Sequence, residues 1–79
     1  MKFRFQDGDE VALRADRHWF LPAGSRGIVF CQYATDPPAY EVNFQDVRGK
    51  IFGAVVEEDE IEVLHEKAVL PIFEAVKTA

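Results

Sequence analysis

Apolar and polar residues alternate with a period of two in two short stretches of the chain. One stretch runs from Glu10 to Arg14, with Ala12 on its polar side, and the other runs from Tyr40 to Gln45. Because successive side chains of a strand point to opposite faces, each stretch predicts a strand with one buried face and one wet face. The residues predicted to point into the core are Val11, Leu13, Tyr40, Val42 and Phe44.

Two more segments have the composition of strands. The segment from Gly27 to Tyr33 is rich in apolar β-formers, which predicts a strand covered on both faces for part of its length. The run Asp36-Pro37-Pro38 ends it in a turn, because proline cannot donate to a strand ladder. The segment from Lys50 to Val56 predicts a fourth strand, in which Gly53 marks a bulge or a tight bend.

The connections between these strands differ in length. Residues 15–26 lack periodicity and contain proline and glycine, so they predict a long loop between the first two strands. The segment from Asp46 to Gly49 predicts a turn. One helical turn is expected from Glu57 to Asp59, and it leads into a short closing strand from Glu60 to Leu64.

The last segment, about residues 66–79, predicts a short helical tail. Pro71 suits the first turn of a helix, and Ile72, Phe73 and Val76 would then share one face. A helix of about eight residues is not stable alone in water, so this one needs a surface to pack on. That surface belongs either to the same chain or to another chain.

The chain as a whole has 79 residues, 48% of them apolar, which predicts a single domain over residues 1–79 with a modest core. No run reaches the roughly 18 apolar residues that cross a bilayer, no secretion signal is visible, and there is one cysteine. We therefore expect a cytoplasmic protein without a membrane partner. The net charge of -5 makes a nucleic-acid partner unfavourable unless the arginines gather on one face.

Glycines punctuate the predicted strands with a recurring spacing. The pattern is Gly8-Asp9-x-Val11, then Gly24-x-x-Gly27-x-Val29, then Tyr40-x-Val42-x-Phe44. Over about residues 7–64 it resembles the SH3-like barrel of the nitrile hydratase beta subunit and of similar small bacterial proteins. The resemblance implies a mainly β fold, an SH3-like five-stranded small barrel, here followed by the short C-terminal helix. It also implies a supporting role, because the metal and its ligands in nitrile hydratase belong to the partner subunit.

Few side chains offer reactive chemistry. Asp16 and His18 in the long loop form a candidate ligand site, with Tyr33 and Tyr40 as further polar groups, but no third ligand stands at a fixed spacing. Cys31 lies among apolar neighbours and is expected to be an inert thiol. The sequence therefore predicts no catalytic residue, no metal and no cofactor.

Apolar residues outnumber what one small core can enclose. Large exposed apolar patches are uncommon on monomers, and small domains gain stability by association. This favours a non-catalytic module that binds protein, either as a homo-oligomer or as an accessory subunit. The alternative is a small-molecule-binding protein or enzyme with a site between the barrels of an oligomer. The predicted interface anchors are Trp19, Phe20, Phe30, Ile72, Phe73 and Val76.

Overall fold

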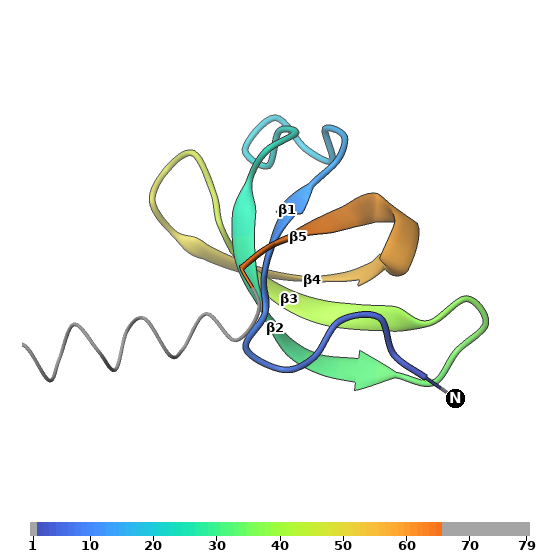
Figure 1. The fold of residues 1–79 in the computed structure, drawn as a ribbon. Coiled ribbons are helices and arrows are strands. Elements are labelled where there is room, and N and C mark those ends of the chain that lie inside the picture. Colours follow the sequence, from blue (N-terminus) through green and yellow to red (C-terminus); the bar gives the residue numbers. More distant parts are fainter. Residues whose placement is uncertain (1, 66–79) are drawn as a thin grey trace, which may run out of the picture.

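The chain folds as one antiparallel sheet of five strands, seen in a computed structural model that describes residues 2–65 (Figure 1). In space the strands follow the order β4-β3-β2-β1-β5, so that β4 and β5 form the two ends of the sheet. A single 3-10 turn, η1, joins these two end strands. The elements are β1 (Glu10–Leu13), β2 (Arg26–Tyr33), β3 (Ala39–Gln45), β4 (Ile51–Glu57), η1 (Glu58–Glu60) and β5 (Ile61–His65).

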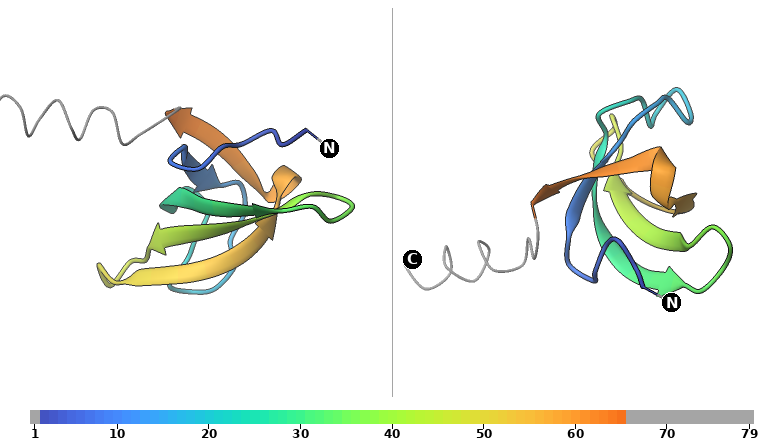
Figure 2. Two further views of the ribbon diagram at one scale, coloured as in Figure 1. Left: turned by 90° about the horizontal axis from the view of Figure 1, so that it is seen from below. Right: turned by 45° about the vertical axis from the view of Figure 1, so that its right-hand side comes forward.

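The predicted mainly β fold and its five strands are confirmed. Each predicted strand lies within one or two residues of its observed bounds, and the helical turn predicted at Glu57 lies one residue later, at Glu58–Glu60. The sheet is strongly curled, as Figure 2 shows, but within residues 2–65 no ladder joins β4 to β5. The helix predicted over residues 66–79 falls outside the described residues.

The core lies on the concave side of the curled sheet. All five residues predicted to point inward are buried, and Tyr40, Val42 and Phe44 have no exposed surface. The polar residues that alternate with these three along β3 lie on the other face of the sheet, so the period of two in the sequence sets which face is wet. The other core residues are Phe5, Leu21, Val29, Ala54, Val56 and Ile61.

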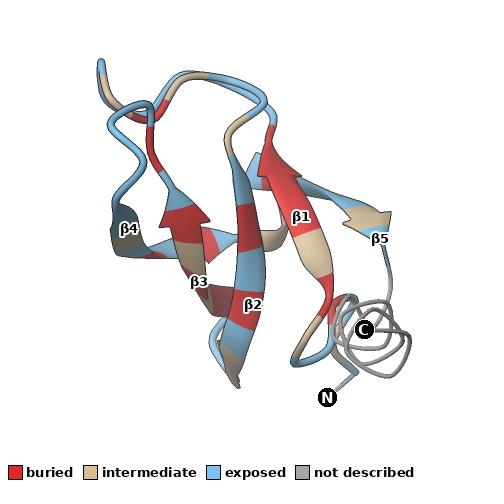
Figure 3. Cartoon of the chain, turned by 90° about the vertical axis from the view of Figure 1, so that its left-hand side faces the viewer, coloured by how far each residue is buried: buried red, intermediate tan, exposed pale blue. Residues whose placement is uncertain are grey.

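The prediction that β2 is covered on both faces for part of its length is wrong for the described residues. Burial alternates along the strand, with Val29 buried and its neighbours Ile28 and Phe30 exposed (Figure 3). The pairing of β2 with β3 also slips between Val29 and Cys31, which leaves Phe30 unpaired in a β-bulge. In the part of the chain from residue 2 to residue 65, this run of apolar residues thus forms an apolar outer face that no second layer covers.

Two smaller predictions are also corrected. Gly53 marks no bulge, because β3 and β4 stay in regular register and Gly53 pairs with Asn43. Ala12, predicted to face solvent, is buried. Its register partners across β1 are Arg26 and Glu62, and these longer side chains flank the small methyl group of Ala12.

The residues before β1 form an arm that is fixed to the sheet. The backbone N–H groups of Arg4 and Phe5 point at the Tyr40 hydroxyl oxygen, at 3.0 and 3.4 Å, and Gln32 donates its side-chain amide to the Phe5 carbonyl. The Phe5 ring packs edge-on against Tyr40, with centroids 5.2 Å apart. The arm therefore covers one end of the core and satisfies the buried Tyr40 hydroxyl.

Candidate functional site: an aromatic loop patch

The long loop between β1 and β2 is folded back on itself by its own hydrogen bonds. Leu21 and His18 form an isolated bridge, and Arg17 N–H donates to the Leu21 carbonyl at 2.9 Å. The Asp16 carboxylate accepts a hydrogen bond from Ala23 N–H at 2.8 Å. Leu21 has no exposed surface and anchors the loop in the core. The loop tip, with Trp19, is therefore held in a defined position.

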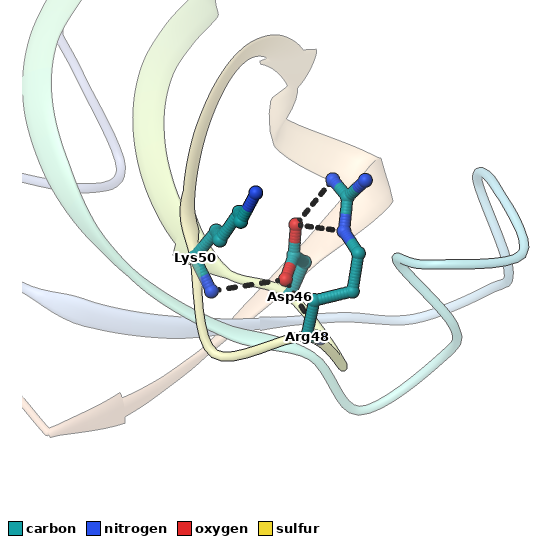
Figure 4. Close-up of polar contacts among 3 residues, drawn as sticks. All are labelled: Asp46, Arg48 and Lys50. Atoms are coloured by element: carbon teal, nitrogen blue, oxygen red, sulfur yellow. Dashed lines mark hydrogen bonds and ion pairs between the residues drawn. The ribbon is translucent and has the colours of Figure 1, made fainter.

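The β3–β4 turn is organised around the carboxylate of Asp46, whose side chain has no exposed surface. It accepts hydrogen bonds from the N–H groups of Arg48 and Lys50 and from the Arg48 guanidinium, the shortest at 2.7 Å (Figure 4). The bonded guanidinium lowers the pKa of Asp46. Gly49 closes the turn with a φ of 79°, a conformation that glycine adopts without steric cost. The turn thus fixes where the Arg48 guanidinium lies.

The loop tip and the β3–β4 turn meet and form one continuous surface. The Val47 N–H donates to the Phe20 carbonyl at 3.0 Å. The Arg48 guanidinium lies over two rings, 4.5 Å from the centroid of Phe20 and 5.6 Å from that of Trp19. We call this surface the aromatic patch. It consists of His18, Trp19, Phe20, Val47, Arg48 and Phe52.

The rings of the aromatic patch support one another. Phe20 stacks on His18 with centroids 4.9 Å apart and packs edge-on against both Trp19 and Phe52. Phe20 and Phe52 are half-buried against the core, whereas Trp19 is 75% exposed and Val47 is 59% exposed. The patch is therefore a fixed base of rings that presents one indole to solvent. Such a surface can bind by apolar packing and by ring stacking. The charge of its arginine, Arg48, is already neutralised by Asp46.

The predicted interface anchors are divided by the fold. Trp19 and Phe20 lie together in the aromatic patch. Phe30 is 62% exposed on the outer face of the sheet, on a different element. The other three predicted anchors, Ile72, Phe73 and Val76, lie outside the described residues.

The four residues of the predicted ligand site are placed in three settings. Asp16 closes the long loop through Ala23, and His18 stacks on Phe20 in the aromatic patch. Tyr40 is buried in the core, while the Tyr33 hydroxyl donates to Glu41 on the outer face at 2.7 Å, and this carboxylate raises the pKa of Tyr33. Within residues 2–65 no hydrogen bond or ring contact joins any two of these four residues.

Sequence reasoning missed three members of the aromatic patch: Val47, Arg48 and Phe52. Phe52 could have been found from the strand alternation, since every second residue points to the same side and Phe52 therefore shares the inward side of β4 with Ala54 and Val56. An aspartate two residues before an arginine and three before a glycine is a turn signal that would also have placed Arg48. What no local pattern indicates is that this turn contacts the tip of the long loop.

Comparison with known proteins adds no further constraint, because no family model, curated protein or solved structure matches this chain. In the part of the chain from residue 2 to residue 65, no three His, Cys, Asp or Glu side chains are grouped so that they could hold a metal ion. The same residues form no helix with the length and apolarity that a bilayer crossing requires.

Proposed function

We propose that this protein is a non-catalytic association module that binds another protein chain through the aromatic patch. The observation that carries the proposal is Trp19, a large indole that is 75% exposed although the Phe20 ring and the Arg48 guanidinium lie against it. Exposing this much apolar area to water is unfavourable, and a partner that covers it recovers the free energy.

The composition of the aromatic patch also suits an interface. Tryptophan, tyrosine and arginine are the residues that contribute most to binding at the centres of protein interfaces. The patch holds a tryptophan and an arginine in direct contact, supported by the half-buried rings of Phe20 and Phe52. Because the loop and the turn fix these groups beforehand, little side-chain entropy is lost on binding.

The proposal extends to the architecture. We take the curled five-stranded sheet to be an SH3-like barrel with an accessory role in a larger assembly. This is supported by the strand order and by η1, which connects the two end strands. A short C-terminal helix bearing Ile72, Phe73 and Val76 remains part of the proposal.

The test is quantitative capture of binding partners by the immobilised full-length chain and by two variants. Trp19→Ala removes the exposed indole, and Phe30→Ala removes an aromatic side chain of similar exposure from the outer face. Trp19→Ala should lose the captured partner, whereas Phe30→Ala should retain it. Because Trp19 is the only tryptophan, its emission should shift to shorter wavelength when the purified partner is added. Equal capture by wild type and Trp19→Ala would contradict the proposal.

A small-molecule site is the second candidate. One hollow, lined by residues that include Arg14, Arg17 and Glu60, has side chains of both charges and includes the predicted ligand residue Asp16. A ligand that binds only the folded chain raises its melting temperature, so a thermal-shift screen with metabolites tests this candidate. A compound that stabilises wild type but not Asp16→Asn would favour it over protein association.

A further inference from the structure

The free edge of β4 carries an inference that goes beyond the proposed function, because it concerns a different surface. Among residues 2–65, β4 is the last strand of the sheet and pairs only with β3. An edge strand presents a row of backbone donors and acceptors that another strand can use. Natural proteins commonly protect such edges with lysine, proline or a bulge. None of these devices interrupts β4 between Ile51 and Val56, and its register with β3 is regular.

The direction of the backbone groups along this edge follows from the β3–β4 ladder. Asp46 N–H donates to the Lys50 carbonyl, so the hydrogen-bonded pairs of the ladder recur at every second position from there. Ile51, Gly53 and Val55 then belong to the non-hydrogen-bonded pairs of the ladder, so their N–H and C=O groups point away from β3. The Arg17 guanidinium, which lies outside the sheet, bonds to the Val55 carbonyl at 3.2 Å, in agreement with this assignment.

The outer face of the sheet is open at the middle of β4. A Cβ added at Gly53 would meet only the side-chain oxygens of Asn43 and Glu41, both on β3, within 4 Å. On either side of Gly53 the outward side chains are apolar and exposed, Ile51 by 68% and Val55 by 51%. Within residues 2–65 the outward backbone groups of Ile51 and Gly53 have no hydrogen-bond partner.

The sequence of β4 is complementary to itself in the antiparallel direction. If Gly53 of one copy lies opposite Gly53 of a second copy, Ile51 of each chain faces Val55 of the other, and both are β-branched residues suited to a cross-strand pair. The strand also begins beside a basic residue, Lys50, and ends at an acidic one, Glu57. Antiparallel pairing brings the basic end of each copy to the acidic end of the other.

We propose that two copies of this chain associate through their β4 edges, as antiparallel strands related by a two-fold axis at Gly53. The two curled sheets then form one continuous ten-stranded sheet, given the five strands of each copy. The Val55 carbonyl can accept from Ile51 of the second copy while it keeps its bond to Arg17, because a carbonyl oxygen has two lone pairs. The opposite edge differs, since β5 carries Glu62 and His65 along its length.

Charge-swap variants of the full-length chain test this register directly. Ile51→Lys with Val55→Lys places like charges opposite each other in the dimer, and Ile51→Glu with Val55→Glu does the same with the opposite sign. Sedimentation equilibrium should show a wild-type dimer, and each double variant should dissociate at least tenfold more readily. An equimolar mixture of the two double variants should form a heterodimer, because each lysine then faces a glutamate.

Two controls keep the outcome interpretable. Val63→Lys places a charge on β5 at a β-branched position that is 44% exposed, and it should leave the dimer intact. Circular dichroism should show the same folded spectrum for every variant, since all the altered side chains are exposed. In the wild type, protection of the Gly53 amide against hydrogen exchange should increase with protein concentration. A wild type that stays monomeric into the millimolar range, or a mixture that stays dissociated, overturns the proposal.

Discussion

Gly27 occupies a position on β2 where the backbone of β3 comes close. A Cβ built there would lie 2.6 Å from Cγ1 of Val42 and 2.8 Å from the Asn43 carbonyl oxygen. The first contact is with a buried core side chain and the second is with backbone, so neither can move aside at low cost. At this position the requirement for glycine comes from space rather than from an unusual φ.

We expect Gly27→Ala to destabilise the protein by about 1–3 kcal/mol, the usual cost of inserting a methyl group into a packed core. Gly53→Ala is the matched control. Its added Cβ would lie 3.3 Å from the Asn43 side-chain oxygen, on an exposed face where that side chain can shift. Urea denaturation of both variants measures the difference. Equal free energies of unfolding for the two variants would show that the close approach at Gly27 does not make its substitution more destabilising.

Asp46 should contribute to the pH dependence of stability. Its pKa is lowered in the folded chain, chiefly by the Arg48 guanidinium, so the unfolded chain binds a proton more readily. The stabilisation is complete above the ordinary aspartate pKa of about 3.9 and is lost as the pH falls through the lower folded pKa.

We therefore expect Asp46→Asn to be less stable than wild type at neutral pH but to lose less further stability on acidification. Denaturant titrations from about pH 5 to about pH 2 measure this slope. Asp36→Asn, which changes an exposed carboxylate, should retain the wild-type slope. Parallel curves for wild type and Asp46→Asn would mean that the Asp46–Arg48 contact does not set acid stability.

At the scale of the strand, the same substitution is expected to reduce folding stability by different amounts on the two faces of the sheet. Phe44 on β3 has no exposed surface, whereas Phe30 on β2 is mostly exposed at the bulge. We expect Phe44→Ala to cost about 3–5 kcal/mol, a large share of the stability of a small domain, and Phe30→Ala to change it by about 0.5 kcal/mol or less. Thermal denaturation of the two variants checks this, and similar losses would mean that the outer face is covered in solution.

The elements were predictable where a period of two is uninterrupted. Tyr40 to Gln45 alternates because β3 has one face that is more exposed, and in both this stretch and Glu10 to Arg14 the residues predicted to point inward are buried, although Ala12 is buried too. β2 was misassigned because its outer face is itself apolar, which a sequence cannot distinguish from a covered face. The bulge at Phe30 was missed, and of the bulge or tight bend expected at Gly53 the bulge is absent, since a register shift depends on how two strands meet.

The candidate site was only partly predictable at the scale of the whole molecule. Trp19 and Phe20 could be singled out from an apolar run inside a loop. Their support comes from Arg48 and Phe52, which lie about 30 residues further along the chain and are brought close only by the fold. Local periodicity carries no information about such a contact.

The two proposed surfaces should act independently. Trp19 lies at the tip of the long loop, and the β4 edge at Gly53 uses backbone groups that the aromatic patch does not contain. We therefore expect Trp19→Ala to leave the sedimentation of the wild-type dimer unchanged, and the lysine double variant of β4 to retain the Trp19-dependent partner. If Trp19→Ala also dissociates the dimer, the two surfaces are one interface and the β4 register is not its basis.

The bond between the N-terminal arm and Tyr40 has a consequence for biosynthesis. The hydroxyl that accepts the Phe5 N–H belongs to a residue 35 positions later, which leaves the ribosome after Phe5. Until β3 is synthesised, the arm lacks the hydroxyl that accepts its two N–H groups and the ring against which Phe5 packs. Completion of β3 therefore sets the earliest moment during synthesis at which the arm can take up its final packing.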